Sequence, residues 1–155
     1  MILVTKKGKS IRFKEKEIRP MGRSAAGVKG ISLKGGDELV GADVINLKVK
    51  TEPKVKQYLL VVTDKGYGKR AILKEYRLQK RGGIGIKTLK LVPKIGTIVA
   101  SRMLSDENQD LIVISQQGQT IRIPINSVSK LGRATQGVRI KKLNEKDKIV
   151  SIACL

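Results

Sequence analysis

The sequence predicts an all-β fold: a propeller-like array of three roughly four-stranded blades in a single repeat domain over residues 1–155. Three observations support this prediction. The chain repeats itself three times, each repeat is built from short runs of β-branched residues between glycine-bearing turns, and no segment has sustained helical periodicity.

The repeat is visible when the chain is aligned with itself. A shift of 58 residues places Gly8 on Gly66, and a further shift of 52 residues places Gly66 on Gly118. The same two shifts superimpose three phrases rich in glycine and basic residues: GRSAAGVKGISL (22–33), KRGGIGIKTLKL (80–91) and GRATQGVRIKKL (132–143). So many matches at fixed offsets predict three repeat units, which we place at residues 2–57, 58–110 and 111–155.

Each unit begins with a predicted β-hairpin. The first strands are the apolar runs ILVT (2–5), LLVVT (59–63) and LIVIS (111–115), and each run meets a polar turn with a glycine. A second run follows that turn, as in SIRF (10–13) and TIRIPI (120–125). Two strand-forming runs around a short glycine turn are typical of a hairpin.

The rest of each unit predicts two further strands. A glycine-rich turn leads into an alternating stretch such as GVRIKKL, and an Asp-bearing turn follows in units one and three, with Asp37 and Asp147. The last strands are ELVGADVI (38–45), TIVASRML (97–104) and KIVSIACL (148–155). An all-β barrel with accidental internal symmetry is the alternative architecture.

Composition narrows the function. Lys and Arg number 33 against 13 Asp and Glu, so the formal net charge is +20 and indicates a polyanionic partner, either nucleic acid or an anionic membrane surface. Histidine is absent and Cys154 is the only cysteine, so we expect no metal site, no cofactor and no catalytic residues. The longest apolar run, YLLVV, is too short to span a bilayer and no secretory signal precedes it, so we expect a cytoplasmic, nucleoid-associated protein without membrane contact.

Basic residues recur at equivalent places in the three units. One set lies on the second strand, one in the glycine-rich turn and one in the alternating strand that follows. These are Arg12, Arg70 and Arg122; Arg23, Arg81 and Arg133; and Lys29, Lys87 and Arg139. Such a repeat predicts a positive stripe along the array that follows a phosphate backbone, with Lys80 beside it.

The turn glycines add to this predicted site. Gly22, Gly82, Gly83 and Gly132 stand next to the turn arginines, and glycines allow backbone N–H groups to approach an anion. A purely conformational role in the turn is the alternative interpretation for them.

The same residues indicate the kind of nucleic acid. Aromatic residues number only three Tyr and one Phe, too few for a single-strand binder that stacks bases, and no helix is predicted that could enter a major groove. We therefore expect contacts to duplex phosphates that ignore base sequence, with bending of the duplex along the curved stripe.

Three stretches resemble the C-terminal domain of the bacterial DNA gyrase A subunit. They are MGRSAAGVKGISLKGGDELVGADVI (21–45), GYGKRAILKEYRLQKRGGIGIKTLKL (66–91) and LGRATQGVRIKKLNEKDKIVSIACL (131–155), and in their order they resemble the last three of that domain's six repeats. The family's seven-residue box, QRRGGKG, lies in its first repeat. QKRGGIG (79–85) is similar to it but lies in the middle unit, with Ile84 in place of Lys, and we interpret it as a blade turn.

The resemblance implies a β-pinwheel, here half of a six-bladed domain, in which neighbouring blades exchange strands. It implies wrapping of duplex DNA as the non-catalytic accessory domain of an ATP-dependent type II topoisomerase that introduces negative supercoils. The implied partners are duplex DNA, the rest of the gyrase A subunit, and gyrase B. Terminal blades without neighbours expose strand edges, so self-association is a further expectation.

Two other functions remain open at this stage. The equivalent domain of topoisomerase IV belongs to the same structural class, and a basic RNA-binding β-protein would fit the charge and the glycines. The sequence argues against an independent enzyme, because it has no His and no phosphate-loop motif.

Overall fold

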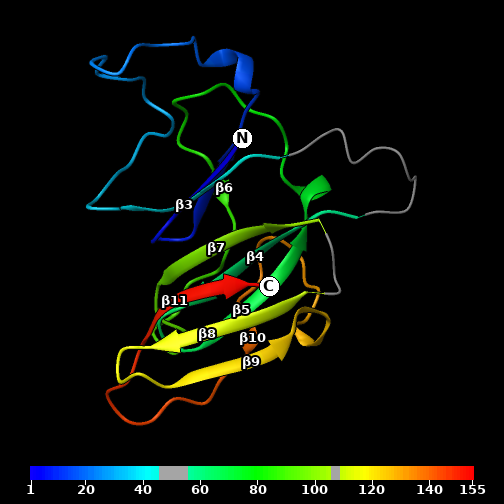
Figure 1. The fold of residues 1–155 in the computed structure, drawn as a ribbon. Helices are drawn as coiled ribbons and strands as arrows, with labels where there is room; N and C mark the ends of the chain where they lie inside the picture. Colours follow the sequence, from blue (N-terminus) through cyan, green and yellow to red (C-terminus); the bar gives the residue numbers. More distant parts are fainter. Residues whose placement is uncertain (46–55, 106–108) are drawn as a thin grey trace.

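A computed structural model describes residues 1–45, 56–105 and 109–155 and confirms the all-β fold (Figure 1). Its strands form three antiparallel sheets, which we number in chain order. Sheet one contains β1 (Ile2–Thr5), β2 (Lys9–Arg12), β3 (Leu39–Asp43) and β6 (Ile86–Lys87). Sheet two contains β4 (Tyr58–Thr63), β5 (Tyr67–Ile72), β7 (Ile98–Leu104) and β10 (Val138–Arg139). Sheet three contains β8 (Asp110–Ser115), β9 (Thr120–Pro124) and β11 (Ile149–Cys154).

Neighbouring units exchange one strand. Strand β6 belongs to unit two but pairs with β2 of unit one, and β10 of unit three pairs with β5 of unit two. The fourth strand of a sheet therefore comes from the following unit, and not from the same unit as the sequence pattern alone suggests. Among the described residues, sheet three has three strands, and the equivalent segment of unit one (28–29) forms no strand.

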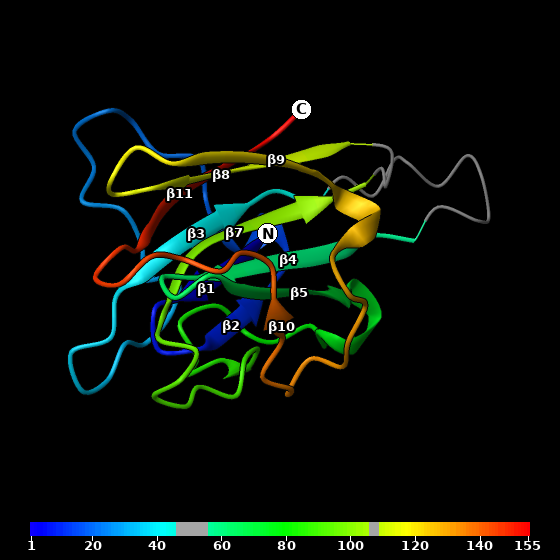
Figure 2. The same ribbon diagram turned by 90° about the horizontal axis from the view of Figure 1, so that it is seen from below.

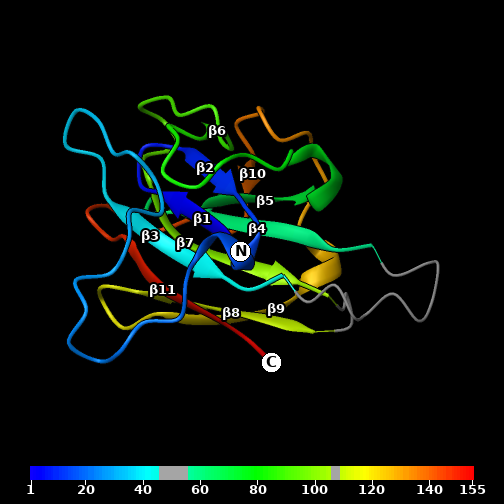
Figure 3. The same ribbon diagram turned by 90° about the horizontal axis from the view of Figure 1, so that it is seen from above.

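The last strand of each unit lies at the centre of the array. Strand β3 contacts β7, and β7 contacts β11, so these three strands lie side by side (Figures 2 and 3). The main-chain amide of Met103 donates to Asp43 Oδ2 at 2.8 Å across the first of these contacts. Because the sheets run in the order β3-β1-β2-β6 and β10-β5-β4-β7, strands β6 and β10 lie at the outer rim.

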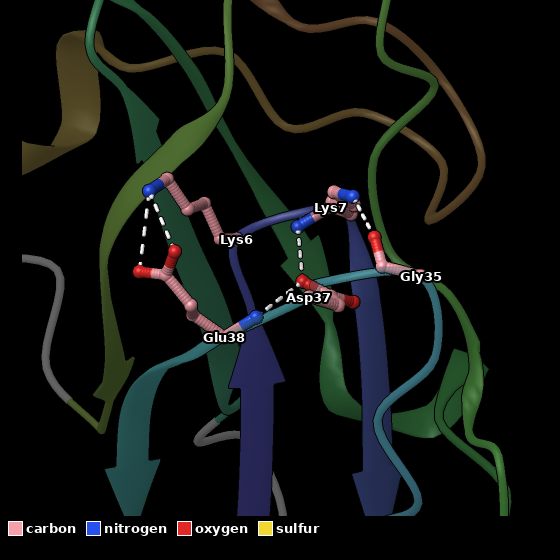
Figure 4. Close-up of polar contacts among 5 residues, drawn as sticks. All are labelled: Lys6, Lys7, Gly35, Asp37 and Glu38. Atoms are coloured by element: carbon pink, nitrogen blue, oxygen red, sulfur yellow. Dashed lines mark hydrogen bonds and ion pairs between the residues drawn. The ribbon is translucent and has the colours of Figure 1, made fainter.

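An aspartate links each hairpin turn of units one and three to the last strand. Asp37 Oδ1 accepts hydrogen bonds from the amides of Lys7 at 2.8 Å and Glu38 at 2.9 Å (Figure 4). Asp147 Oδ1 does the same for the amides of Gln117 at 3.1 Å and Lys148 at 2.8 Å. Both predicted Asp-bearing turns are thus capped by their own side chains, which satisfies amides that the strands leave unpaired.

The apolar core lies between successive sheets. Strand β4 is buried on both faces: Leu59 and Val61 join the cluster shared with sheet one, whereas Leu60 and Val62 join the cluster shared with sheet three. A smaller cluster of Leu3, Ile11, Phe13 and Ile31 covers the outer face of sheet one. The alternation of side chains along each strand therefore links the three sheets into one array.

Each second strand ends in a single turn of 3₁₀ helix. These turns are η1 (Glu15–Glu17), η3 (Leu73–Glu75) and η4 (Ile125–Ser127), at equivalent places in the three units. In the part of the chain that the structure describes, no helix has the length and apolar character needed to cross a membrane.

Candidate nucleic-acid interface

Two lysines face each other on the neighbouring strands β2 and β6 of sheet one. Lys9 on β2 is the cross-strand partner of Lys87 on β6, and both side chains are exposed. Cross-strand neighbours lie about 5 Å apart at Cβ, and like charges at this distance destabilise a sheet unless an anion compensates them. Within the described residues, neither lysine takes part in an ion pair.

The equivalent place on sheet two holds a tyrosine and an arginine. Arg139 on β10 is the cross-strand partner of Tyr67 on β5; its guanidinium donates to the Tyr67 hydroxyl at 2.9 Å and lies 5.4 Å from the ring centre. Arg139 is exposed, so Tyr67 orients a guanidinium that still faces solvent.

A basic cavity of about 410 Å³ opens beside Arg139. Several of its lining residues are basic, from units two and three: Lys65, Lys94, Lys141, Lys142, Lys146 and Lys148. Of the described residues that line it, only Asp147 is acidic, and its Oδ1 is occupied by backbone amides. The cavity thus concentrates positive charge at the joint between units two and three, which favours an anionic ligand.

The predicted turn arginines Arg81 and Arg133 hold the backbones of neighbouring segments in place. Arg81 Nη1 donates to the carbonyl oxygen of Lys29 at 2.6 Å, and Arg133 Nη1 donates to the carbonyl oxygen of Lys87. Each arginine therefore reaches back to the preceding unit and fixes the backbone of a predicted phosphate-binding lysine. Arg23, the equivalent residue of unit one, is exposed.

Two glutamates also connect Arg81 and Arg133 to the preceding units. The Arg81 amide donates to Glu17 Oε2 at 2.9 Å, and the Arg133 amide donates to Glu75 Oε2 at 2.6 Å. The hydrogen bond from the Arg81 amide lowers the pKa of the Glu17 carboxyl. Glu17 and Glu75 are equivalent under the repeat, which is a signal in the sequence that could have identified them.

Arg12 and Arg70 also point into the protein. Arg12 Nη1 donates to the carbonyl oxygen of Tyr76 at 3.1 Å, and Arg70 Nε donates to that of Val128 at 2.8 Å. Arg70 is only 2% exposed, and burial lowers the pKa of Arg12. Both guanidiniums bind the η turn of the next unit, so we leave them out of the phosphate surface that we propose below.

Arg122 is equivalent to Arg12 and Arg70 but lies at the open end of the array. Its guanidinium is exposed and pairs with Asp110, with 2.6 Å between Nε and Oδ2. At this repeat position the arginine is therefore half-buried in unit one and buried in unit two, each of which a described unit follows, and exposed in unit three.

The four predicted turn glycines differ in their hydrogen bonds and in their exposure. The Gly82 amide donates to the carbonyl oxygen of Gly30 at 2.8 Å, and the carbonyl oxygens of Gly83 and Gly132 accept protein hydrogen bonds from Ser32 and Lys69. Gly82 has a φ of +80°, which favours glycine. Gly22 lies in an exposed loop, and a Cβ added there would meet no described atom within 4 Å.

Lys69 is a buried cation that sequence reasoning missed. Its Nζ donates to the carbonyl oxygens of Gly132 at 2.8 Å, Arg133 at 2.7 Å and Thr135 at 3.0 Å. Burial lowers the pKa of Lys69 to about 8. Lys69 stands where units one and three have isoleucine, and this break in the repeat is the signal that marks it.

The exposed predicted residues are Arg23, Lys29, Lys80, Lys87, Arg122 and Arg139. Lys87 and Arg139 share the outer rim, and Lys9, which sequence reasoning missed, lies beside Lys87. The described residues hold no group of three or more Asp, Glu, Cys or His side chains placed to bind a metal ion.

Comparison with known proteins gives the family. The DNA gyrase C-terminal domain, beta-propeller family matches residues 1–46, 57–104 and 109–155. The chain is 46% identical to the DNA gyrase A subunit of Staphylococcus epidermidis over 143 residues and 40% identical to that of Kosmotoga olearia over 153 residues. These matches cover 92% and 99% of this chain but 15% and 18% of the relatives, so the chain spans less than a fifth of their length.

Solved structures agree with this family. The chain superimposes on a DNA gyrase A C-terminal domain with a TM-score of 0.82 and 28% identity, covering 99% of this chain and 49% of that one. A C-terminal domain of DNA topoisomerase IV shares the fold, with a TM-score of 0.87, 23% identity and 46% of that chain covered. The chain therefore belongs to the DNA gyrase C-terminal, beta-propeller family, and its fold is that of the gyrase A C-terminal domain.

Proposed function

We propose that this chain binds duplex DNA without base preference and bends or wraps it, as the accessory C-terminal domain of a gyrase A subunit that supports negative supercoiling. The observation that carries this proposal is the rim of the array. Lys87 on the outermost strand β6 and Lys9 on the adjacent strand β2 stand there as exposed like charges, with no ion pair among the described residues. Arg139 is presented at the equivalent place on the next sheet.

The rim suits a phosphate backbone better than a small anion. Lys87 and Arg139 are related by the repeat, so a cation recurs from one sheet to the next along the rim, as phosphates recur along a duplex. The net charge of +20 adds long-range attraction that falls with ionic strength. Arg81 and Arg133 support the site as positioning residues, because they fix the backbones of Lys29 and Lys87.

The parent enzyme belongs to the same proposal. The relatives are whole gyrase A subunits, so we place this chain in an assembly with the rest of gyrase A and with gyrase B, and the cleavage chemistry lies outside it. The topoisomerase IV alternative rests on a shared fold alone, whereas both curated relatives described above are gyrase subunits.

A binding titration tests the proposal. Fluorescence anisotropy with two duplexes of about 30 bp and unrelated sequence should give equal affinities, and log K should fall with log [salt] at a slope of about −4 to −6 if five or six phosphates are neutralised. Tighter binding to double-stranded RNA than to DNA would favour the RNA-binding alternative instead. Religation of nicked circles in the presence of the protein tests wrapping. If the protein wraps DNA, the religated circles should show a shift in linking number.

A further inference from the structure

The basic cavity beside Arg139 has walls whose backbone is held in place. Its lining residues all belong to units two and three. The amides of Ile140 and Lys141 donate to the carbonyl oxygen of Gly66 at 2.8 and 3.1 Å, so this segment of unit three docks on the hairpin turn of unit two. Another part of the wall is the turn that Asp147 caps. The cavity is therefore preorganised, which lowers the cost of binding a ligand.

The repeat is broken where this cavity forms. Units one and two have Ile31 and Leu89 at the position of Lys141, and these two residues are only 8% and 2% exposed. The same shift places Val92, which packs against the core, at the position of Asn144. Unit three thus has a half-buried cation where the other two units have a buried apolar side chain. The packing of the fold does not explain a lysine at this position.

Lys146 has a backbone conformation that favours glycine. Its φ is +67°, the same value as that of Gly36, the equivalent residue of unit one. Among the described residues, Lys146 is the only non-glycine residue with a positive φ. Side chains are disfavoured in this region, and residues held there are concentrated at functional sites. Unit three therefore keeps a lysine at a strained position, and this lysine lines the cavity.

Most of the lysines around the cavity lack a negatively charged partner. Those that form no ion pair with any described residue are Lys65, Lys94, Lys141, Lys142, Lys146 and Lys148. Like charges gathered in a confined space repel one another, and a multivalent anion bound among them removes that repulsion. The volume of about 410 Å³ lies within the range of small-ligand sites, about 300–1,000 Å³, and is far too small to contain a duplex.

We propose that this cavity binds a compact oligophosphate, which is a small anion with several linked phosphate groups, such as tripolyphosphate or the phosphate chain of a nucleotide. Several separate cations match several negative charges, and ammonium and guanidinium groups form short, charge-assisted hydrogen bonds with phosphate. Lys141 supplies a half-buried cation, and Lys146 and Arg139 supply exposed ones. Tyr67 is the only aromatic residue in the described lining, and Arg139 already lies over its ring, so the site recognises phosphates rather than a base.

Arg139 connects this cavity to the rim. It lines the cavity, and it also stands at the place on the rim where we propose a contact with duplex phosphates. An oligophosphate and a duplex therefore compete for Arg139, so a bound oligophosphate weakens DNA binding. This consequence rests on the proposed function, whereas the oligophosphate site itself does not.

Isothermal titration calorimetry with tripolyphosphate, in the absence of DNA, tests the site. The unmodified chain should bind it saturably and at least about tenfold more tightly than monophosphate at equal ionic strength. Lys141→Leu introduces the residue of unit two, and Lys146→Gly introduces that of unit one, so both variants should keep the fold in thermal unfolding. Each should weaken tripolyphosphate binding at least about fivefold, because each removes a cation from the cavity.

A matched control separates the cavity from the net charge. Lys74→Gln removes the same charge from an exposed residue on η3, outside the cavity, and should change the affinity for tripolyphosphate less than about twofold. Equal weakening in all three variants would mean that tripolyphosphate responds only to the charge of +20. That result, or no saturable binding up to about 1 mM, would overturn the proposal.

ATP identifies the source of the phosphates. An affinity no higher than that of tripolyphosphate would support a site that recognises the phosphate chain alone. Much tighter binding of ATP, lost in Lys141→Leu, would identify a nucleotide as the ligand and would contradict the expectation that the base makes no contact.

Displacement of a fluorescent duplex tests the competition for Arg139. Tripolyphosphate should release more duplex than sulfate at equal ionic strength, and Lys141→Leu should abolish this excess. Equal release by the two anions would contradict the shared role of Arg139. If the chain binds no DNA at all, calorimetry still decides whether the cavity binds oligophosphate, so failure of the proposed function is distinguishable from failure of this proposal.

Discussion

Arg81 Nη1 donates a hydrogen bond of 2.6 Å to the backbone carbonyl oxygen of Lys29, so an arginine of unit two fixes the backbone of a lysine of unit one. Its equivalent, Arg133, makes the same contact with Lys87. The repeated arginine and the repeated lysine are therefore two halves of one joint, in which the arginine positions and the lysine faces solvent.

Alanine substitutions at Arg81 and Arg23 should separate an arginine that holds the backbone of the preceding unit from one that is exposed. Arg81→Ala removes hydrogen bonds to Lys29 and Glu17, so we expect it to lower the free energy of unfolding by about 1–3 kcal/mol. Arg23→Ala removes the same residue type from an exposed loop and should change it by less than about 0.5 kcal/mol. Urea denaturation measures both, and equal losses would contradict the positioning role.

Arg70 and Arg122, which lie on the second strands of units two and three, allow a similar comparison. Arg70→Ala leaves the carbonyl oxygens of Asn126 and Val128 without their donors in a buried site, so we expect a loss of about 3 kcal/mol or more. Arg122→Ala removes an exposed ion pair with Asp110 and should cost about 0–1 kcal/mol. Thermal unfolding of the two variants compares them directly, and a small loss for Arg70→Ala would show that its burial contributes little.

Stability should depend on pH through Lys69. Burial lowers the pKa of Lys69 to about 8, while an unfolded lysine titrates near 10.5. Between pH 8 and pH 10 the unfolded chain therefore binds more protons, and the free energy of unfolding rises with pH by up to about 1.4 kcal/mol per unit. Lys69→Ile, which restores the residue of units one and three, should flatten this rise in urea titrations at each pH.

Tyr76 should reverse the trend at higher pH. Burial raises the pKa of its hydroxyl to about 12, and the hydroxyl lies 2.7 Å from Thr88 Oγ1. Above pH 10 the unfolded tyrosine loses its proton first, so the free energy of unfolding falls as pH rises towards 12. Tyr76→Phe should remove this fall and keep the rise below pH 10. An unchanged profile in both variants would mean that other groups control the pH dependence.

The hairpins could be predicted from the sequence, and the exchange of strands from the residues alone could not. β-Branched runs around Gly8, Gly66 and Gly118 specify two strands and a turn because both signals are local. An alternating stretch such as 138–143 indicates a strand but not its partner, since partner choice depends on contacts distant in sequence. The family resemblance supplied what the pattern lacked.

The candidate site was predictable to a smaller extent. Repeat symmetry treats Arg12, Arg70 and Arg122 as equal, although Arg12 and Arg70 bind carbonyl oxygens of the next unit and Arg122 is exposed. Lys9 and Lys87 are cross-strand partners because of the register between two strands from different units, and composition does not encode that register. Exposure on a strand was a sound expectation for Lys87 because it alternates with the half-buried Ile86.

The most direct test of the central claim compares DNA binding by two variants that each lose one positive charge. Lys87→Gln removes a cation from the outer rim, and Arg102→Gln removes one from β7 at the centre of the array, so both lower the net charge equally. Lys87→Gln should weaken binding to unrelated duplexes alike and reduce the salt slope by about 1, while Arg102→Gln should leave the slope nearly unchanged. Equal slopes for the two variants would contradict a phosphate-binding rim.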